Sequence, residues 1–311
     1  MKKILFATSA LIATAGMAAA EAEVTFGGYG RFGLVYDEGN SDSATAKETR
    51  LETRFRLNIG ASTTTDSGVK FEGRFQLETN DNSTGGQEGE GPGAAGFAVS
   101  AGGFRLDVGN VSDVFDSGDV IDIFGHGIGL TDLVETNNAF GSNGIDEQGF
   151  GEDSIDQNIV KVRYSVADFT VAASYTEEND STGDSSYYQI GAAYSFGDHT
   201  IGAAYGDRDN AAEESYWAVN ANGEFGALGY NLLVGDSDAV DDVVYGLSLS
   251  YDISSATELR FASSFGGDDA NDDAYGIGFR HKLGGGVSLR GGAGQDIEGN
   301  TIADLGVRFD F

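Results

Sequence analysis

Two sets of charged side chains in the first half of the chain could act together. The first set is basic and lies at alternate positions of three expected β-strands: Arg31, Arg54, Arg56, Lys70 and Arg74. The second set is acidic and lies between residues 110 and 157: Asp113, Asp116, Asp119, Asp122, Asp132 and Glu135. If the two sets face each other over a narrow gap, they create a transverse electric field. Such a field orients water and ions and slows apolar solutes, so these residues predict a pore constriction.

The basic residues have a simpler alternative role, which is cross-strand pairing along the sheet. Acidic partners are available on the same expected strands: Glu48, Glu52, Glu72 and Glu78. Opposite charges on neighbouring strands stabilise a sheet, whereas like charges stacked on one face are costly without an opposing acid. We therefore favour the constriction and leave the pairing open.

Bond-breaking chemistry finds little support in the sequence. There is no Cys, so thiolate catalysis, Cys-ligated zinc and disulfides are excluded. The segment His126-Gly127-Ile128-Gly129 faintly resembles the oxyanion loop of esterases, but no Gly-x-Ser-x-Gly elbow accompanies it. The other histidines are His199 and His281. A catalytic triad at the rim of a β-barrel remains only as an alternative. We expect that the protein is not an enzyme and requires no cofactor.

Acidic clusters in two later loops could hold Ca²⁺, which prefers hard oxygen ligands. Their members are Asp236, Asp238, Asp241 and Asp242, and then Asp268, Asp269, Asp272 and Asp273. None matches an EF-hand, and a run of acids can also be a hydrated loop. Ca²⁺ at the acidic loops is therefore possible, and no metal ligands are assigned.

The charge balance bears on the partners. The formal net charge is −32, and without Lys2 and Lys3 there are 16 basic against 50 acidic residues, an excess of 34 acids. Nucleic acid is not expected as a partner, because phosphate binding needs clustered Lys and Arg. Cations are favoured, and we expect a weak cation preference.

The N-terminus predicts a secretory signal peptide over residues 1–20. Two lysines precede an apolar run from Ile4 to about Gly16, and Ala18-Ala19-Ala20 ends it. A membrane helix is the alternative, but a run of roughly 15 residues is short of the ~20 that a helix needs to span a bilayer. The mature domain is expected to cover residues 21–311.

Alternation of apolar and charged residues is the main structural signal. In 47–61, Leu51, Phe55, Leu57 and Ile59 alternate with Arg, Glu and Asn. Charges at every second position need water on that face, which excludes a dry sandwich core. Similar segments are expected at 24–36, 47–61, 69–77, 96–101, 104–109, 159–166, 169–176, 186–196, 200–206, 216–225, 228–235, 243–253, 257–265, 274–283, 287–295 and 302–311.

The connections between these segments alternate between short turns and longer acidic loops, as in an outer-membrane barrel. Aromatic residues near the segment ends predict a girdle at the two membrane interfaces: Tyr29, Tyr36, Tyr164, Tyr175, Tyr187, Tyr188, Tyr194, Tyr205, Trp217, Tyr230, Tyr251 and Tyr275. The fold class expected is all-β, a transmembrane antiparallel β-barrel of about sixteen strands, which leaves an aqueous channel. The long segment 110–157 is expected to fold inward and constrict this pore.

At this point the chain resembles the general porins of α-proteobacteria, of the Rhodobacter type. The resemblance rests on Glu23-Val24 with Arg31-Phe32-Gly33, Arg54 and Arg56 ahead of 64–68, Thr131-Asp132-Leu133, and the ending 303–311. It implies a homotrimer in the lipid of a Gram-negative outer membrane, with the third external loop, 110–157, in the lumen. The implied function is passive diffusion of small hydrophilic solutes and ions.

Two other classes stay as alternatives. An outer-membrane barrel could serve as an adhesin or a rim-site hydrolase, although three histidines leave little for catalysis. A soluble acidic β-solenoid would show a Gly-Asp nonapeptide repeat, and the sequence has none.

Overall fold

The computed structural model describes residues 22–41, 47–81, 93–142, 144–151, 157–180, 183–209 and 214–311. The expected signal peptide, residues 1–20, lies outside the described residues. So do residues 143 and 152–156 of the expected pore loop.

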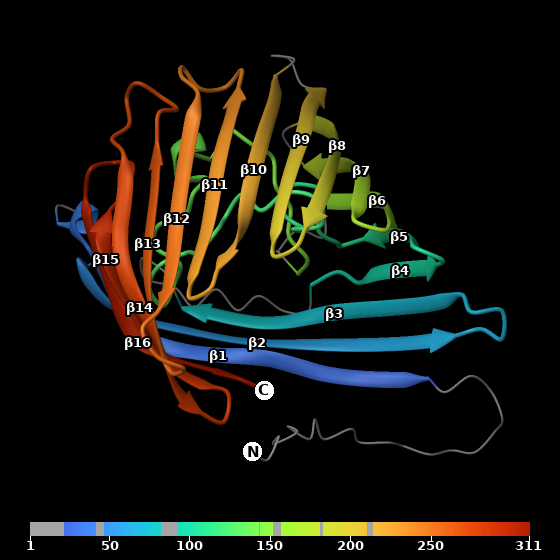
Figure 1. The fold of residues 1–311 in the computed structure, drawn as a ribbon, viewed down its shortest axis with the longest axis horizontal. Helices are drawn as coiled ribbons and strands as arrows, with labels where there is room; N and C mark the ends of the chain where they lie inside the picture. Colours follow the sequence, from blue (N-terminus) through green and yellow to red (C-terminus); the bar gives the residue numbers. More distant parts are fainter. Residues whose placement is uncertain are drawn as a thin grey trace.

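The described residues form sixteen antiparallel strands that close into one barrel (Figure 1). Each strand pairs with its neighbours in sequence, and β1 pairs with β16 to close the ring. The strands are β1 (Glu23–Asp37), β2 (Thr49–Thr64), β3 (Lys70–Asp81), β4 (Gly96–Ala101), β5 (Phe104–Gly109), β6 (Gln157–Val166), β7 (Phe169–Asp180), β8 (Gly183–Phe196), β9 (His199–Asp209), β10 (Ser215–Phe225), β11 (Leu228–Ser237), β12 (Val244–Asp252), β13 (Thr257–Phe265), β14 (Ala274–Gly284), β15 (Val287–Gln295) and β16 (Thr301–Asp310). The fold class and the strand number predicted from the sequence are confirmed.

Two short 3-10 turns, η1 (Glu38–Asn40) and η2 (Asn138–Phe140), are the helical elements of the described residues. Within those residues no helix is both long and apolar enough to cross a membrane.

The barrel is apolar outside and polar inside. Leu51 of β2 is 69% exposed, whereas Glu52 beside it is 1% exposed. A water-soluble protein would bury the leucine and expose the glutamate, so this arrangement needs apolar surroundings outside the wall. Successive side chains of a strand point to opposite faces, so the same division into an apolar outer face and a polar inner face recurs along the wall.

Strand ends match the sequence prediction best where the turns are tight. Residues 257–265 and 287–295 were predicted to the residue as β13 and β15. Strands that lead into long loops extend further than predicted, as in β8, which begins at Gly183 rather than at 186. Residues 183–185 are Gly, Asp and Ser, a composition typical of loops, so nothing in the sequence indicated that the strand continues there.

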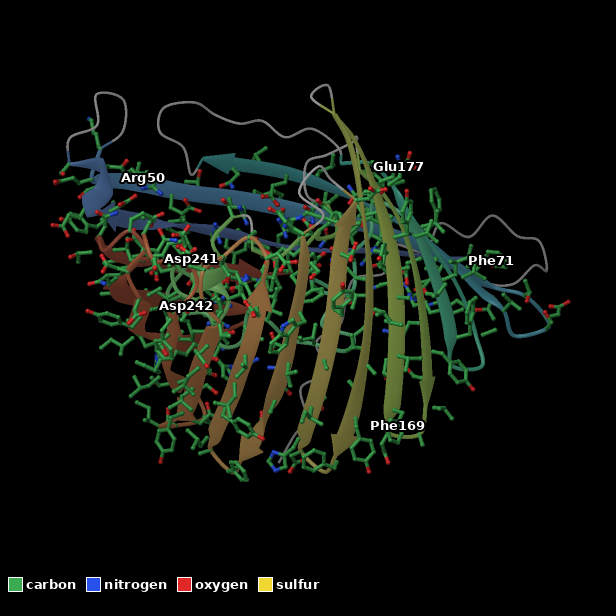
Figure 2. All side chains as sticks on the ribbon, turned by 90° about the horizontal axis from the view of Figure 1, so that it is seen from above. Arg50, Phe71, Phe169, Glu177, Asp241 and Asp242 are labelled. Atoms are coloured by element: carbon green, nitrogen blue, oxygen red, sulfur yellow. The ribbon has the colours of Figure 1, made fainter. Side chains whose placement is uncertain are left out.

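Aromatic rings line the tight-turn end of the barrel, where Phe169 lies (Figure 2). The ring centroids of Phe169 and Tyr194 are 4.5 Å apart, and those of His199 and Phe225 are 4.7 Å apart. Such a row is typical of a membrane interface. Tyr29 was expected in the girdle but faces the lumen beneath Arg56 and Arg308, because it shares the parity of Arg31.

Candidate pore constriction

The segment after β5 lies against the inner wall of the barrel, as the green ribbon inside the ring of strands shows (Figure 1). Its backbone bonds to inward-facing side chains of distant strands. The His126 amide donates to Ser248 Oγ of β12 at 2.8 Å, and the Ala139 amide donates to Ser264 Oγ of β13 at 2.8 Å. The inner hydroxyl groups of the wall therefore satisfy loop amides that would otherwise be buried without partners.

Small residues on the inner wall let this segment approach the strands closely. A Cβ added at Gly202 of β9 would overlap the carbonyl oxygen of Val120, and one at Gly246 of β12 would overlap that of Thr136. Loop side chains fill the remaining space and form one buried cluster with Ala, Tyr, Leu and Val of β7–β12: Val114, Phe115, Val120, Ile121, Ile123, Ala139, Phe140 and Ile145. The loop is thus packed as a core, which fixes its position in the lumen.

Asp113 anchors the start of this segment and is fully buried. It accepts hydrogen bonds from the amides of Asp116 and Gln148, each at 2.9 Å, and from Gln189 Nε2 at 3.1 Å. Burial raises the pKa of Asp113 to about 7, although these donors oppose the shift. These hydrogen bonds connect three parts of the chain, and they hold the Asp113 carboxylate away from the open lumen.

Asp119 is held by two bases on β6. It accepts from Lys161 Nζ at 2.9 Å and pairs with Arg163. Burial alone would raise its pKa, but the two cations lower it. Asp122 accepts from the Gly125 amide at 2.9 Å and from Asn231 Nδ2 at 2.8 Å. Both acids therefore fasten the loop to the wall.

The tip of the segment reaches the far side of the barrel. Asp132, which adopts a left-handed backbone with φ of 57°, pairs with Arg280 of β14 at 2.9 Å. The loop thus follows the inner wall from β6 to β14.

A cavity of about 680 Å³ separates part of this loop from the wall of β1 and β2. Its basic side includes Arg31, Arg54 and Arg56, and its acidic side includes Asp116, Asp132 and Glu135. Other lining residues are Tyr29, Val35, Tyr36, Asp37, Arg50, Glu52, Phe124, Thr131, Leu133, Ile302 and Arg308. Six of the eleven residues predicted from the sequence thus meet around one cavity, bases on one side and acids on the other.

The wall arginines also pair along the sheet. Arg31 contacts Glu52 at 2.7 Å, and Glu78 receives both Arg54, at 3.0 Å, and Arg56. Tyr29 also helps to hold Arg54 in position, because Arg54 donates a hydrogen bond to the Tyr29 hydroxyl at 3.3 Å. These arginines thus pair along the sheet and also line the cavity, because a guanidinium has five donors and one carboxylate does not occupy all of them.

The other two predicted bases lie elsewhere on the same wall. Lys70 and Arg74 line a second cavity, of about 230 Å³. Lys70 pairs with Glu72 at 2.9 Å, and Arg74 lies 3.9 Å from the ring centroid of Phe150.

Glu135 is a cavity acid with a strongly shifted pKa. Burial raises it well above its ordinary value, and the negative charges of Asp132, Glu147 and Asp122 raise it further. The Glu135 carboxyl group therefore keeps its proton to a higher pH than an exposed glutamate does.

Four arginines on the last strands were missed by the sequence prediction: Arg260, Arg280, Arg290 and Arg308. Arg308 faces Arg31 directly across the β1–β16 pair and lines the main cavity. Closure of sixteen strands makes the first and last strands neighbours, so the charged position of Arg308 between the apolar Val307 and Phe309 was the signal that could have found it.

The residues considered for other chemistry are dispersed. His199 contacts the Tyr230 hydroxyl at 3.1 Å, His281 contacts Thr257 Oγ1 at 2.8 Å, and His126 lies in the loop. Across the described part of the chain, no group of three or more His, Asp or Glu is placed to hold a metal ion.

Comparison with known proteins gives a consistent result. The family described as Gram-negative porin matches residues 7–301. A porin of Fuscovulum blasticum is 30% identical over 302 residues, which cover 93% of this chain and 100% of that protein. A porin of Rhodobacter capsulatus is 28% identical over 328 residues, with the same coverage. A solved structure of a Rhodopseudomonas blastica porin triple mutant has a TM-score of 0.76 at 28% identity, covering 93% of this chain and 100% of that one.

Proposed function

Because the chain belongs to the family of Gram-negative porins and forms an outer-membrane channel for small hydrophilic solutes, we propose that the segment 110–157 sets the narrowest point of that channel. We further propose that the channel is weakly cation-selective and works as a homotrimer. The chain acts as a channel and not as an enzyme.

The cavity between the loop and the β1–β2 wall carries this proposal. Arg31, Arg54 and Arg56 stand on one side of it, and Asp116 and Asp132 stand on the other. Opposite charges on facing sides give a field across the path, and the low dielectric of the protein strengthens that field. Water and ions can align with it, whereas an apolar solute cannot replace the ordered water.

Shortening the segment between Ser117 and Leu133 tests whether the loop sets the minimum cross-section. The proposal predicts a larger single-channel conductance and entry of larger sugars in liposome swelling. Sugar permeation equal to that of the wild type would place the narrow point at the barrel wall instead.

The weak cation preference follows from where charges remain unbalanced. Wall arginines at the cavity already pair with Glu52 and Glu78, so their pull on anions is reduced. Further acids lie at the long-loop end, where Asp241 and Asp242 stand at the mouth (Figure 2). Mouth charges concentrate cations within a Debye length, ~10 Å at 0.1 M salt.

Reversal potentials in a KCl gradient measure this preference directly. We expect a small cation preference that fades as salt rises, because screening shortens the reach of the mouth charges. A clear anion preference would show that the arginine side dominates.

Strand length supports an oligomer. β4 and β5 have six residues each, about 20 Å at 3.3 Å per residue, while the apolar band of a barrel is about 25 Å tall and spanning strands have about 9–11 residues. Lipid alone would leave this part of the wall poorly matched, whereas a neighbouring subunit can cover it. We place the contact between copies at β4 and β5, where Phe97 and Phe104 face outward with 58% and 46% exposure.

Native mass spectrometry in mild detergent tests the stoichiometry. A mass of three chains is expected, and Phe97→Glu with Phe104→Glu should shift it to one. A wild-type monomer would remove the homotrimer and leave the barrel.

In this proposal the channel needs no cofactor. Ca²⁺ bound at the acidic loops would only neutralise mouth charge, so chelation with EDTA should leave conductance unchanged or raise the cation preference. Loss of conductance on chelation would contradict it.

A further inference from the structure

A third inner-wall cavity, of about 430 Å³, lies at the tight-turn end of β13–β16. Its charged lining residues are Arg260, Arg280, Lys282 and Arg290, together with Asp252, Glu258 and Asp310. We propose that this cavity binds small oxyanions of the phosphate type, through Arg290 and its neighbours. The idea is separate from the constriction, because it concerns another cavity.

The strand register concentrates positive charge here. Arg280 of β14 stands directly opposite Arg290 of β15, and Lys282 stands opposite Ser288. Side chains at i and i+2 share a face, so Arg280 and Lys282 both project inward beside Arg290. Like charges directly opposite each other destabilise a sheet. A bound anion that contacts both side chains of such a pair offsets this repulsion.

Three of the arginines in this region already have a carboxylate partner. Arg260 pairs with Glu258, Arg280 with Asp132 at 2.9 Å, and Arg308 with Asp310 at 2.8 Å. Two of the three acids that line the cavity, Glu258 and Asp310, are therefore engaged. They would oppose a bound anion less than free carboxylates would.

Arg290 differs from these arginines. Within the described residues it has no carboxylate oxygen inside 4.0 Å, and its Nε donates a hydrogen bond to Ser288 Oγ at 3.1 Å. Its two terminal nitrogens are left to meet a ligand. The neighbouring Arg280 Nε is buried and has no partner either. The hydrogen bonding of this pair is thus incomplete in the protein alone.

An oxyanion fits this set of donors better than chloride does. A guanidinium presents two parallel N–H groups that match two oxygens of one phosphate, and an ammonium such as that of Lys282 adds a point charge. The cavity volume leaves room for a solute that carries a phosphate group as well as for free phosphate. Because the protein as a whole is strongly acidic, a local site of this kind would hold anions that the mouths repel.

Equilibrium dialysis of the detergent-solubilised protein against radiolabelled inorganic phosphate at low salt tests the site without relying on conduction. Loss of a charge-assisted hydrogen-bond partner should weaken binding by about tenfold or more in Arg290→Gln, while Arg290→Lys should retain part of it. Arg105→Gln is the matched control, because Arg105 is an inner-wall arginine that already pairs with Glu72 and Asp107. It should bind phosphate as the wild type does.

Glucose 6-phosphate as competitor separates the two sources of the ligand chemistry. Displacement of labelled phosphate shows that phosphorylated solutes share the site, and binding without displacement restricts it to free phosphate. Lys282→Gln is a second variant, and should weaken binding in the same direction if Arg290→Gln does not fold. Equal phosphate binding in wild type, Arg290→Gln and Lys282→Gln, or no saturable binding in the wild type, would overturn the proposal.

Discussion

Asp304 on the last strand holds Thr131 at the tip of the lumen loop, 173 residues earlier in the chain. Its Oδ2 accepts from the Thr131 amide at 2.8 Å, from the Thr131 hydroxyl at 2.9 Å and from the Leu130 amide at 2.7 Å. Since Asp119 is fixed to β6 at the other end, the loop is fastened on two sides of the barrel. Its acids are thereby kept opposite the arginines of β1 and β2.

Replacing Asp304 by Ala should release the loop tip. Hydrogen bonds to a charged group contribute about 1.5–3 kcal/mol each, so losing three of them removes most of this hold. We expect noisier single-channel currents with brief openings to a larger conductance. Asp107→Ala, which removes another inward acid, is the control. Current noise in Asp304→Ala as low as in this control would show that apolar packing alone fixes the tip.

Gly202→Val should displace the middle of the loop. A Cβ at this position would overlap the Val120 carbonyl oxygen, and that backbone cannot rotate away as a side chain could. Overpacking of this kind costs about 1–3 kcal/mol, so the barrel should still form while the loop shifts. Conductance is expected to change. Ala203→Val, on the outward face of the same strand, should leave it unaltered, and equal conductance in both variants would refute the close approach.

Replacing Arg54 and Arg56 by Gln should strengthen the cation preference. A unit charge about 10 Å from the ion path contributes roughly 0.4 kcal/mol in water, so removing two of them should raise cation permeability and lower anion permeability by about fourfold each at low salt, and change their ratio by about 16-fold. Reversal potentials in a KCl gradient give the ratio. An unchanged ratio would mean that ions pass elsewhere in the channel.

Cation preference should rise with pH through Glu135. Burial and neighbouring acids raise the pKa of this side chain. Glu135 therefore stays protonated at pH values at which an exposed glutamate is already ionised, and it ionises only near its raised pKa. Ionisation above that range adds negative charge beside Asp132, at some cost to stability, because the folded state binds this proton more tightly than the unfolded chain does. Reversal potentials recorded over a pH series should show the rise in wild type and lose it in Glu135→Gln. A rise of the same size in both would assign it to the mouth acids.

The sequence predicted the barrel and the face on which its charges lie, but not the destination of each charge. The period of two is enough to place Arg31, Arg54 and Arg56 on one face. Asp113, Asp116 and Asp119 look alike in sequence, yet loop turns send the first into a buried hydrogen-bond network, the second to the cavity and the third to Lys161. Where each of these side chains points depends on how the whole loop packs, and the neighbouring residues in the sequence do not indicate it.

The inward glycines and alanines carried a signal that was not used. Gly202 and Gly246 were visible at inward positions, and small residues there indicate a close approach of other chain segments. At Gly292 the backbone of the loop residue Gly129 lies so close that a larger residue on the strand would meet it. A predicted barrel with a small-residue inner face thus indicates where an inward loop packs.

A single cysteine at position 116 tests the central claim most directly, because the chain has no cysteine of its own. In Asp116→Cys, a bulky charged thiol reagent should lower the single-channel conductance in discrete steps, one for each modified subunit. Ala270→Cys, at an exposed position of a mouth loop, should react with little effect on the current. If mass spectrometry shows complete labelling of Asp116→Cys and the conductance does not fall, the cavity between the loop and the arginine wall is not the conducting path.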